Sequence, residues 1–295
     1  MRCLLLGGGG FLGSHLAESL VEAGHAVHVF ERPHLEQLLS PSVLSRVTWT
    51  EGDFGNAAAV ESVLEGAEVI FHLISTTIPK TSNDNPIFDA ETNLVATLRL
   101  LERIKHEPRR VIFLSSGGTV YGRPEQTPIP EEHPTNPICS YGITKLAIEK
   151  YLYMYHELYG IPYAVLRLSN PYGGRQRTAA LQGAIAVFLY KALRREPIEI
   201  WGDGEVIRDY VYIDDVVDAL RRAMTSTSLQ RVLNIGSGVG TSINAVLDEI
   251  AQLLGRPVER DLHAALGREL RVENDADCLA ASEAVDGAGA GCNVV

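Results

Sequence analysis

Two side chains suited to proton transfer, Tyr141 and Lys145, lie four residues apart in a segment with a helical pattern. Residues at this spacing share one face of a helix. An ammonium group beside a phenol favours the phenolate and lowers the phenol pKa from about 10 toward the working range. We therefore interpret Tyr141 as an acid/base that takes a proton from a hydroxyl group while hydride leaves the same carbon.

A glycine cluster joins an apolar run to the next helical pattern: Gly7-Gly8-Gly9-Gly10-Phe11-Leu12-Gly13. Glycine permits a sharp turn and a close approach to a pyrophosphate, whose charge is stabilised at the positive end of a helix dipole. The position between a strand and a helix favours this function over a glycine turn without ligand. We predict that the cofactor binds at Gly7, Gly10, Phe11, Leu12 and Gly13.

Charged residues after the next two predicted strands bear on which dinucleotide binds. Glu31 can accept hydrogen bonds from both adenosine ribose hydroxyls, which favours NAD. Arg32 could instead pair with a 2′-phosphate, so NADP is the alternative. Asp53, followed by Phe54, could hold the adenine amino group, although Gly52-Asp53 is also a common turn.

The elements that must position these residues follow an alternating pattern. Apolar runs predict strands at 2–6, 26–31, 47–51, 68–73, 110–115 and 162–167, and three- and four-residue spacing predicts helices at 10–23, 56–65, 86–106 and 140–159. Such alternation is typical of α/β proteins and indicates a Rossmann-type doubly wound parallel sheet. We expect residues 1–168 with 206–236 to form this domain. A smaller, interleaved C-terminal substrate-binding part is expected at 169–205 with 237–260, followed by an atypical tail at 261–295.

Composition narrows the class of protein. The chain has 295 residues, of which 45% are hydrophobic and 21% charged, and a net charge of −11. This charge argues against a nucleic-acid partner, and no apolar run has the length of a membrane span. The four cysteines lack metal-ligand spacing, and Met1–Leu6 does not resemble a signal peptide. We predict a cytoplasmic enzyme without a metal site.

Further motifs occur in a characteristic order. They are Gly7-x-x-Gly10-x-x-Gly13, His72-Leu73, Asn93, Ser115-Ser116-Gly117-Gly118-Thr119-Val120-Tyr121-Gly122, Tyr141-x-x-x-Lys145, Arg167-Leu168-Ser169-Asn170-Pro171-Tyr172-Gly173 and Arg208-Asp209-Tyr210-Val211. Over about residues 1–260, the chain resembles the extended short-chain dehydrogenases/reductases, particularly the UDP-glucose 4-epimerase-like sugar-nucleotide epimerases.

The resemblance implies a function and further site residues. It implies NAD-dependent epimerisation, at C4, of a nucleoside diphosphate sugar such as UDP-glucose or UDP-galactose, through a transient 4-keto intermediate. Lys145 would anchor the nicotinamide ribose, Asn170 would meet the sugar nucleotide, and Arg208 would meet its diphosphate. The resemblance also implies a homodimer formed through 86–106 and 140–159. It adds Leu73 and Asn93 to the cofactor site, and Ser75 and Thr76 to the substrate site.

One position departs from the family pattern. Many relatives have a serine or threonine three residues before the valine of Val-Tyr-Gly, where it hydrogen-bonds the reacting hydroxyl, and this chain has Gly117. Ser116 or Thr119 could supply that hydroxyl, with Ser116 slightly favoured. The nearby threonine-acid-acid segment of sugar-nucleotide dehydratases is also absent, which argues against 4,6-dehydration.

The tail does not continue the family pattern. Residues 261–295 resemble an internal fragment of a repressor/open-reading-frame/kinase family sugar kinase, with Asp275 at the position of its catalytic base. Loss of the usual diphosphate-binding segment would weaken sugar-nucleotide binding. This tail and Gly117 leave a catalytically impaired NAD-binding protein as one alternative to an epimerase, and a sugar-nucleotide reductase or dehydrogenase is the other.

Overall fold

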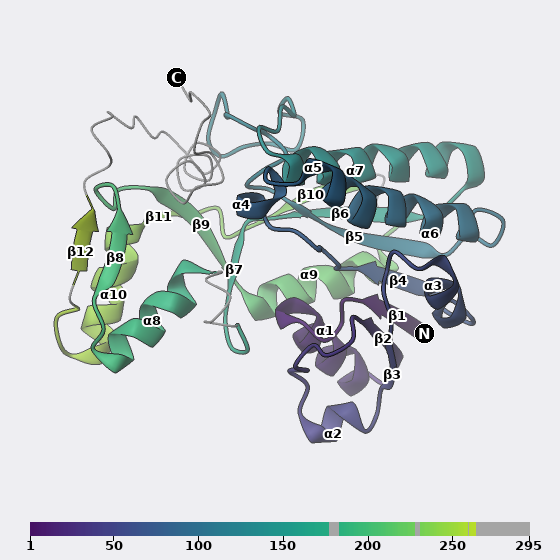
Figure 1. The fold of residues 1–295 in the computed structure, drawn as a ribbon, viewed down its shortest axis with the longest axis horizontal. Coiled ribbons are helices and arrows are strands. Elements are labelled where there is room, and N and C mark those ends of the chain that lie inside the picture. The colour runs from purple at the N-terminus through teal and green to yellow at the C-terminus, as the bar shows by residue number, and fades with distance from the viewer. Residues whose placement is uncertain (177–182, 228–230, 259, 264–295) are drawn as a thin grey trace.

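Seven parallel strands form the main sheet, in the order β10-β6-β5-β4-β1-β2-β3 (Figure 1). Their bounds are β1 Arg2–Leu6, β2 Ala26–Glu31, β3 Thr48–Glu51, β4 Val69–His72, β5 Arg110–Ser116, β6 Tyr163–Leu168 and β10 Val232–Ile235. The computed structural model describes residues 1–176, 183–227, 231–258 and 260–263. The sequence prediction of a Rossmann-type doubly wound sheet is confirmed.

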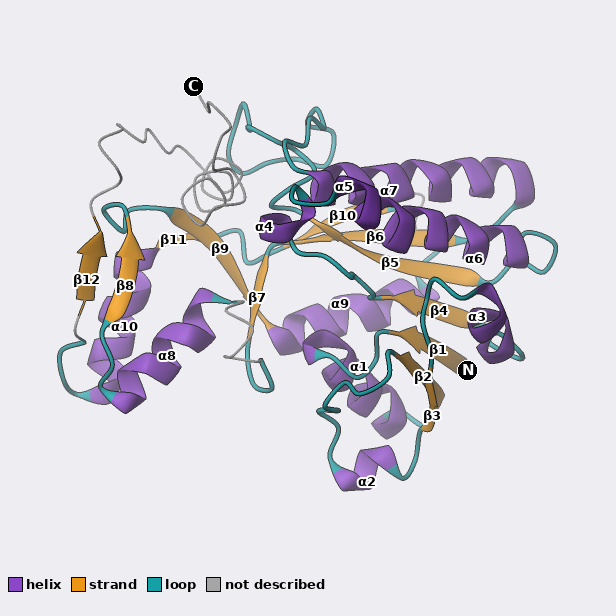
Figure 2. Ribbon diagram, in the orientation of Figure 1, coloured by secondary structure: helices purple, strands orange, loops and turns teal. Residues whose placement is uncertain are grey.

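Helices cover both faces of this sheet, which explains why its central strands are apolar on both sides (Figure 2). One face packs against α1 Phe11–Glu22 and α9 Ile213–Thr225, and α2 Pro41–Leu44 lies at its margin. The other face packs against α3 Ala57–Val63, α6 Ala96–Ile104 and α7 Ser140–Tyr159. Each core consists mainly of buried leucine, isoleucine, valine and phenylalanine side chains.

The segment predicted as one helix at 86–106 is divided. It consists of α5 Pro86–Asp89, a π-helical turn at Ala90–Val95, and α6. A further short helix, α4 Pro79–Ser82, precedes it. Proline at the first position favours both short helices, since its missing N–H would have no partner there. Side-chain bonds of Asn93 and Asp89, described below, hold the π-helical turn.

A smaller lobe is built from two excursions of the chain. It contains β7 Asn170–Tyr172, α8 Ala184–Arg194, β8 Ile198–Trp201, β9 Ile207–Tyr212, β11 Gly240–Ser242, α10 Ile243–Leu254 and β12 Arg260–His263. Strands β11, β9 and β7 form one sheet, and β12 pairs with β8 in another. Helices α8 and α10 pack on a small apolar core that includes Ile198, Ile200, Leu247 and Ile250.

Two boundaries of the expected division differ from the observed pairing. Strand β9 was assigned to the dinucleotide domain, but in the lobe it pairs in parallel with β7 and antiparallel with β11. Residues 261–263, assigned to the tail, extend β12 beside β8. Residues 264–295, including Asp275, lie outside the described residues. Among the helices of the described part of the chain, none is both long and apolar enough to cross a membrane.

Candidate active site

The glycine turn lies where the strand order reverses, between β1 and β4, which is where doubly wound sheets open a crevice for ligands. Gly7 adopts φ +91°, a left-handed conformation that glycine tolerates, and its N–H donates to the Phe30 carbonyl at 2.9 Å. A Cβ on Gly13 would lie 2.3 Å from the Gly7 carbonyl oxygen, so this helical position requires glycine. A Cβ on Gly10 would meet only that oxygen, at 3.8 Å, which leaves open space beside the start of α1.

Glu31, at the end of β2, closes one side of the turn. Its side chain is 7% exposed, and its carboxylate accepts hydrogen bonds from the Gly9 N–H at 3.1 Å and from the Arg32 N–H at 3.0 Å. Arg32 itself is exposed. The two hydrogen bonds therefore hold the Glu31 carboxylate beside the turn.

The first two turns of helix α7 carry Tyr141 and Lys145, near the carboxyl ends of β4 and β5. Lys145 is buried, and its Nζ donates to the Leu114 carbonyl oxygen at 3.0 Å. The same ammonium lies 4.8 Å from the centroid of the Phe113 ring and 5.5 Å from that of Tyr141. The two predicted residues are thus brought together at the end of the sheet that the glycine turn also occupies.

The pKa of Tyr141 differs from the sequence expectation. Burial raises it to about 12, while a hydrogen bond with the Ser75 side chain lowers it and the charge of Asp89 raises it. Burial also lowers the pKa of Lys145 to about 8, against the charges of Asp89 and Glu149. Desolvation of the buried phenol is thus the main cause of the raised pKa of Tyr141. The lowered phenol pKa predicted from the Tyr-Lys spacing is therefore not found.

Gly117 has no side chain to bond a reacting hydroxyl, and a Cβ there would meet the carbonyl oxygens of Arg167 and Leu168 at 3.3 Å. Thr119 is 4% exposed, and its hydroxyl has no hydrogen-bond partner among the described residues. Ser116 ends β5 and is half-buried. The Ser75 hydroxyl interacts with the Tyr141 phenol and donates to the Thr77 carbonyl at 2.9 Å. The sequence interpretation considered only Ser116 and Thr119 for this role.

The remaining predicted cofactor residues lie around the same end of the sheet. Asn93 is buried, accepts from the Thr76 N–H at 3.0 Å and donates to the Thr76 hydroxyl at 2.7 Å. It thereby fixes the segment after β4, which includes Leu73 and Ser75. Asp53 is exposed and accepts from the Gly55 N–H at 2.8 Å. Phe54 is buried, and Phe11 and Leu12 begin α1.

The predicted substrate residues of the lobe lie on neighbouring strands. Asn170 of β7 pairs with Tyr210 of β9, and its side chain donates to the Asp209 carbonyl at 3.2 Å. Arg208 lies on β9, opposite Thr241. The Asp209 carboxylate is occupied by the N–H groups of Ser237 and Gly238 at 2.8 and 2.9 Å. Asn170 and Arg208 are therefore held on one small sheet beside the main domain.

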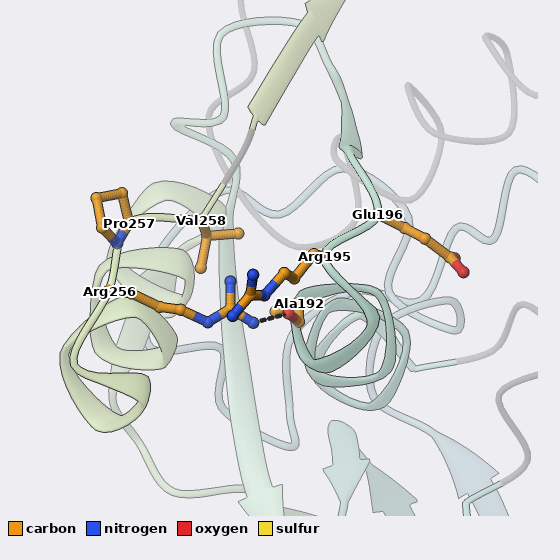
Figure 3. Close-up of a pocket in the computed structure, with 6 residues that line it drawn as sticks. All are labelled: Ala192, Arg195, Glu196, Arg256, Pro257 and Val258. Atoms are coloured by element: carbon orange, nitrogen blue, oxygen red, sulfur yellow. Dashed lines mark hydrogen bonds between the residues drawn. The ribbon is translucent and has the colours of Figure 1, made fainter.

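A cavity of about 330 Å³ lies elsewhere, in the lobe (Figure 3). It is lined by Ala192, Arg195, Glu196, Arg256, Pro257 and Val258, where the ends of α8 and α10 meet. The Arg256 guanidinium donates to the Ala192 carbonyl, and the Glu196 side chain points away from both arginines. This cavity contains no residue of the glycine turn or of α7, so it is distinct from the candidate active site.

Sequence reasoning missed one buried carboxylate of the site. Asp89 is completely buried and binds side chains on both sides of Tyr141, as described below. Its spacing from Asn93 was the available signal, because residues four apart on a helix can bond to each other. In the described part of the chain, no three His, Cys, Asp or Glu side chains are grouped as metal ligands.

The fold and this arrangement of a glycine turn, a buried lysine and an adjacent tyrosine define a dinucleotide-dependent enzyme of the Rossmann class. The family model described as NAD dependent epimerase/dehydratase family matches residues 3–236. The chain belongs to this family, and its cofactor is NAD.

Relatives of known structure or assigned activity agree with this membership. A putative UDP-glucose 4-epimerase of Methanocaldococcus jannaschii is 35% identical over 254 residues, which span 85% of this chain and 82% of that protein. The crystal structure of Thermotoga maritima UDP-glucose 4-epimerase with UDP-glucose has a TM-score of 0.84 and 34% identity, over 93% of this chain and 89% of that one. The Thermus thermophilus UDP-glucose 4-epimerase complex with NAD has a TM-score of 0.81 and 30% identity, over 95% and 92% of the two chains. The resemblance of residues 261–295 to a sugar kinase finds no support among these relatives.

Proposed function

We propose that this NAD-dependent sugar-nucleotide epimerase inverts carbon 4 of the sugar in a nucleoside diphosphate sugar such as UDP-glucose or UDP-galactose. One observation carries the proposal: Tyr141 and Lys145 lie together at the carboxyl ends of β4 and β5, beside the glycine turn. Related structures with UDP-glucose and with NAD support the choice of substrate class and cofactor.

The residues present fit the dinucleotide. The space beside Gly10 admits a pyrophosphate at the N-terminus of α1, because no side chain fills it. Glu31 would receive the adenosine ribose, with Arg32 and Asp53 at the margin, and Leu73, Asn93 and Lys145 would border the nicotinamide end. When bound, NAD supplies the hydride acceptor and then the hydride donor. Because no net redox change results, retention of the cofactor between turnovers is expected.

Tyr141 is the acid/base that transfers the proton of the sugar hydroxyl. The phenolate removes the proton of the sugar hydroxyl at C4, and the phenol returns it after the keto sugar has turned over. The Lys145 ammonium, 5.5 Å from the phenol ring centroid, stabilises the phenolate. The Ser75 hydroxyl bonds to the phenol from the opposite wall, and Ser116 and Thr119 are the candidates for a bond to the reacting hydroxyl.

The substrate is held mainly by its nucleoside diphosphate, at a distance from the reacting carbon. Arg208 of β9 would bind the diphosphate, and Asn170 of β7 would contact the sugar nucleotide, with Ser75 and Thr76 at the sugar. A fixed diphosphate with a freely turning sugar allows both faces of C4 to be presented to one dinucleotide. This supports a division into residues 1–168 with the α9–β10 segment for the dinucleotide, and the two lobe excursions for the substrate.

Substitution of Tyr141 by Phe tests the proposal. The variant keeps the ring but loses the proton carrier, so turnover of UDP-glucose to UDP-galactose falls by about 10²–10⁴-fold while NAD affinity is retained. Products are identified by mass spectrometry after chromatographic separation, and NAD affinity is measured by calorimetry. Accumulation of NADH in solution in proportion to product would instead indicate the dehydrogenase alternative. Full activity of Tyr141→Phe would refute the assigned role.

We also propose that a second copy of the chain covers the outer surface of α5 and α7. Large apolar side chains are exposed there, namely Ile87, Phe88, Ile143, Tyr153 and Leu158. Apolar surface of this kind on adjoining elements is typical of a protein interface. Sedimentation equilibrium of the wild-type protein and of Leu158→Glu tests the homodimer. A monomeric wild-type protein at micromolar concentration would contradict it.

A further inference from the structure

Asp89, the last residue of α5, has a completely buried carboxylate. It accepts hydrogen bonds from the Thr77 hydroxyl at 2.5 Å, the Asn93 amide at 2.9 Å, the Ser140 hydroxyl at 2.7 Å and the Thr144 hydroxyl at 2.8 Å. These four donors are neutral, so hydrogen bonds rather than a salt bridge offset the cost of burying the carboxylate. An apolar side chain would fill this position without the desolvation free energy of a carboxylate, so packing alone does not explain Asp89.

Two of the groups that donate to Asp89 adjoin Tyr141 and Lys145 in the sequence. Ser140 immediately precedes Tyr141, and Thr144 immediately precedes Lys145. Thr77 belongs to the segment after β4, in which Ser75 bonds to the Tyr141 phenol. One carboxylate thus joins the start of α7 to the segment after β4 that contacts the Tyr141 phenol.

The start of α7 depends on this part of the chain in a second way. Cys139, at the N-cap, makes no side-chain capping bond. The N–H groups of Ser140 and Tyr141 have no acceptor within the helix. They donate instead to the Asn83 side chain at 2.8 Å and to the Ser82 hydroxyl at 3.1 Å. Segment 82–89 therefore supplies both the cap of α7 and the carboxylate that binds its first-turn hydroxyls.

The charge of Asp89 also reaches both functional side chains. It raises the pKa of Tyr141 and raises that of Lys145. The other titratable groups that face this pair are Cys139 and Glu149 of the α7 segment and His72 of β4. Glu149 acts on Lys145, and the Lys145 charge lowers the pKa of His72.

We infer that Asp89 is a positioning residue, which fixes the orientation of Tyr141 and Lys145 through Ser140, Thr144 and Thr77 and sets the pH range of their proton transfer. The inference rests on the proposed role of Tyr141 in epimerisation. Asp89 reaches the reacting atoms only through these partners, so its substitution should change kcat rather than the KM for the sugar nucleotide.

Asp89→Asn tests the inference, with Thr144→Val as the matched variant. The asparagine keeps the shape but loses the negative charge, so both limbs of the pH profile of kcat move to lower pH, and kcat at the optimum falls roughly tenfold or more. Thr144→Val removes one hydrogen bond and keeps the charge, so kcat falls while both limbs keep their positions. A disturbance of packing alone lowers kcat without moving the limbs.

Further outcomes separate this inference from the proposed function. The role of Asp89 would be overturned if Asp89→Asn had the wild-type kcat and the wild-type pH profile of kcat. If Tyr141→Phe were inactive in the same assay, the role of Tyr141 would stand. An active Tyr141→Phe would overturn the proposed function itself. If Asp89→Asn does not fold, the Ser140→Ala/Thr144→Val variant removes both bonds to α7. A wild-type kcat in that variant, with an unchanged circular dichroism spectrum, would overturn the positioning role.

Discussion

Glu149 and Arg167 form an ion pair in the interior, with their closest nitrogen and oxygen 2.7 Å apart and side chains only 3% and 5% exposed. The pair joins α7 to β6 one helical turn beyond Lys145. Ser115 donates to the Glu149 carboxylate at 2.5 Å, and Arg167 donates to the Tyr121 hydroxyl at 2.8 Å. The helix that carries Tyr141 and Lys145 is therefore tied to β5 and β6 through polar bonds beneath the site.

Breaking this pair should strongly destabilise the protein. Glu149→Gln leaves the Arg167 guanidinium buried without a counter-charge, so the free energy of unfolding falls by about 3–5 kcal/mol. Glu61→Gln is the control, because its pair with Arg103 is at a similar distance, 2.8 Å, but is half exposed, and its loss costs less than about 1 kcal/mol. Urea unfolding followed by circular dichroism compares the two. Equal losses in both variants would contradict the expected importance of burial.

Two glycines of the turn should separate cofactor binding from stability. Gly13→Ala would place a Cβ 2.3 Å from the Gly7 carbonyl oxygen and 2.6 Å from the Gly8 Cα, so backbone must move and both stability and NAD binding are lost. Gly10→Ala has no protein atom closer than 3.8 Å, so its stability stays near that of the wild type. Its Cβ enters the space expected for the pyrophosphate, and NAD affinity falls by about tenfold or more. Thermal unfolding and calorimetric titration check both variants.

Lys145→Met should lose activity and change the pH dependence of stability. Burial lowers the folded-state pKa of Lys145 from 10.5 to about 8. Between these values the unfolded chain binds more protons, so this residue makes the wild-type free energy of unfolding rise with pH, by at most about 1.4 kcal/mol per unit. The variant lacks that rise, and its kcat falls by about 10²-fold or more. Unfolding curves from pH 8 to 9.5 test this, with Lys150→Met on the exposed face of α7 as control.

His72 should make the protein sensitive to acid. The ring is buried between Phe54 and Phe113, its Nε2 lies 2.7 Å from the Thr97 hydroxyl, and burial lowers its pKa to about 3. Below pH 6.5 the His72 ring binds a proton in the unfolded chain but stays neutral in the folded protein, so the free energy of unfolding falls as pH falls toward 3. His72→Met should reduce this loss by about 1–2 kcal/mol between pH 7 and pH 5. The exposed His106→Gln serves as control, and equal acid sensitivity of both variants would refute the assignment.

Local patterns were sufficient to predict the main sheet. Buried parallel strands have apolar runs on both faces, and these runs located β1, β2, β4, β5 and β6. The Tyr-Lys spacing and the glycine cluster predicted groups that the structure brings to one end of that sheet. This part of the site depends on short-range spacing and on strand order, both of which leave a direct trace in the sequence.

Tertiary effects were not predictable in this way. The raised pKa of Tyr141 results mainly from burial, which the local sequence does not reveal. The contact of Ser75 with the phenol and the bonds of Asp89 to Ser140 and Thr144 join segments about 50 or more residues apart. The placement of β9 was not predictable because the sequence of a short strand does not specify its partners, here β7 and β11.

The junction between β9 and α9 has a mechanical consequence. Strand β9 ends at Tyr212 and α9 begins at Ile213, with no connecting loop, and α9 packs against α1. Arg208 on β9 and helix α1 are therefore connected through α9 without an intervening loop. A displacement of β9 would be passed to α9 and to its packing surface on α1, because no flexible segment lies between the two elements.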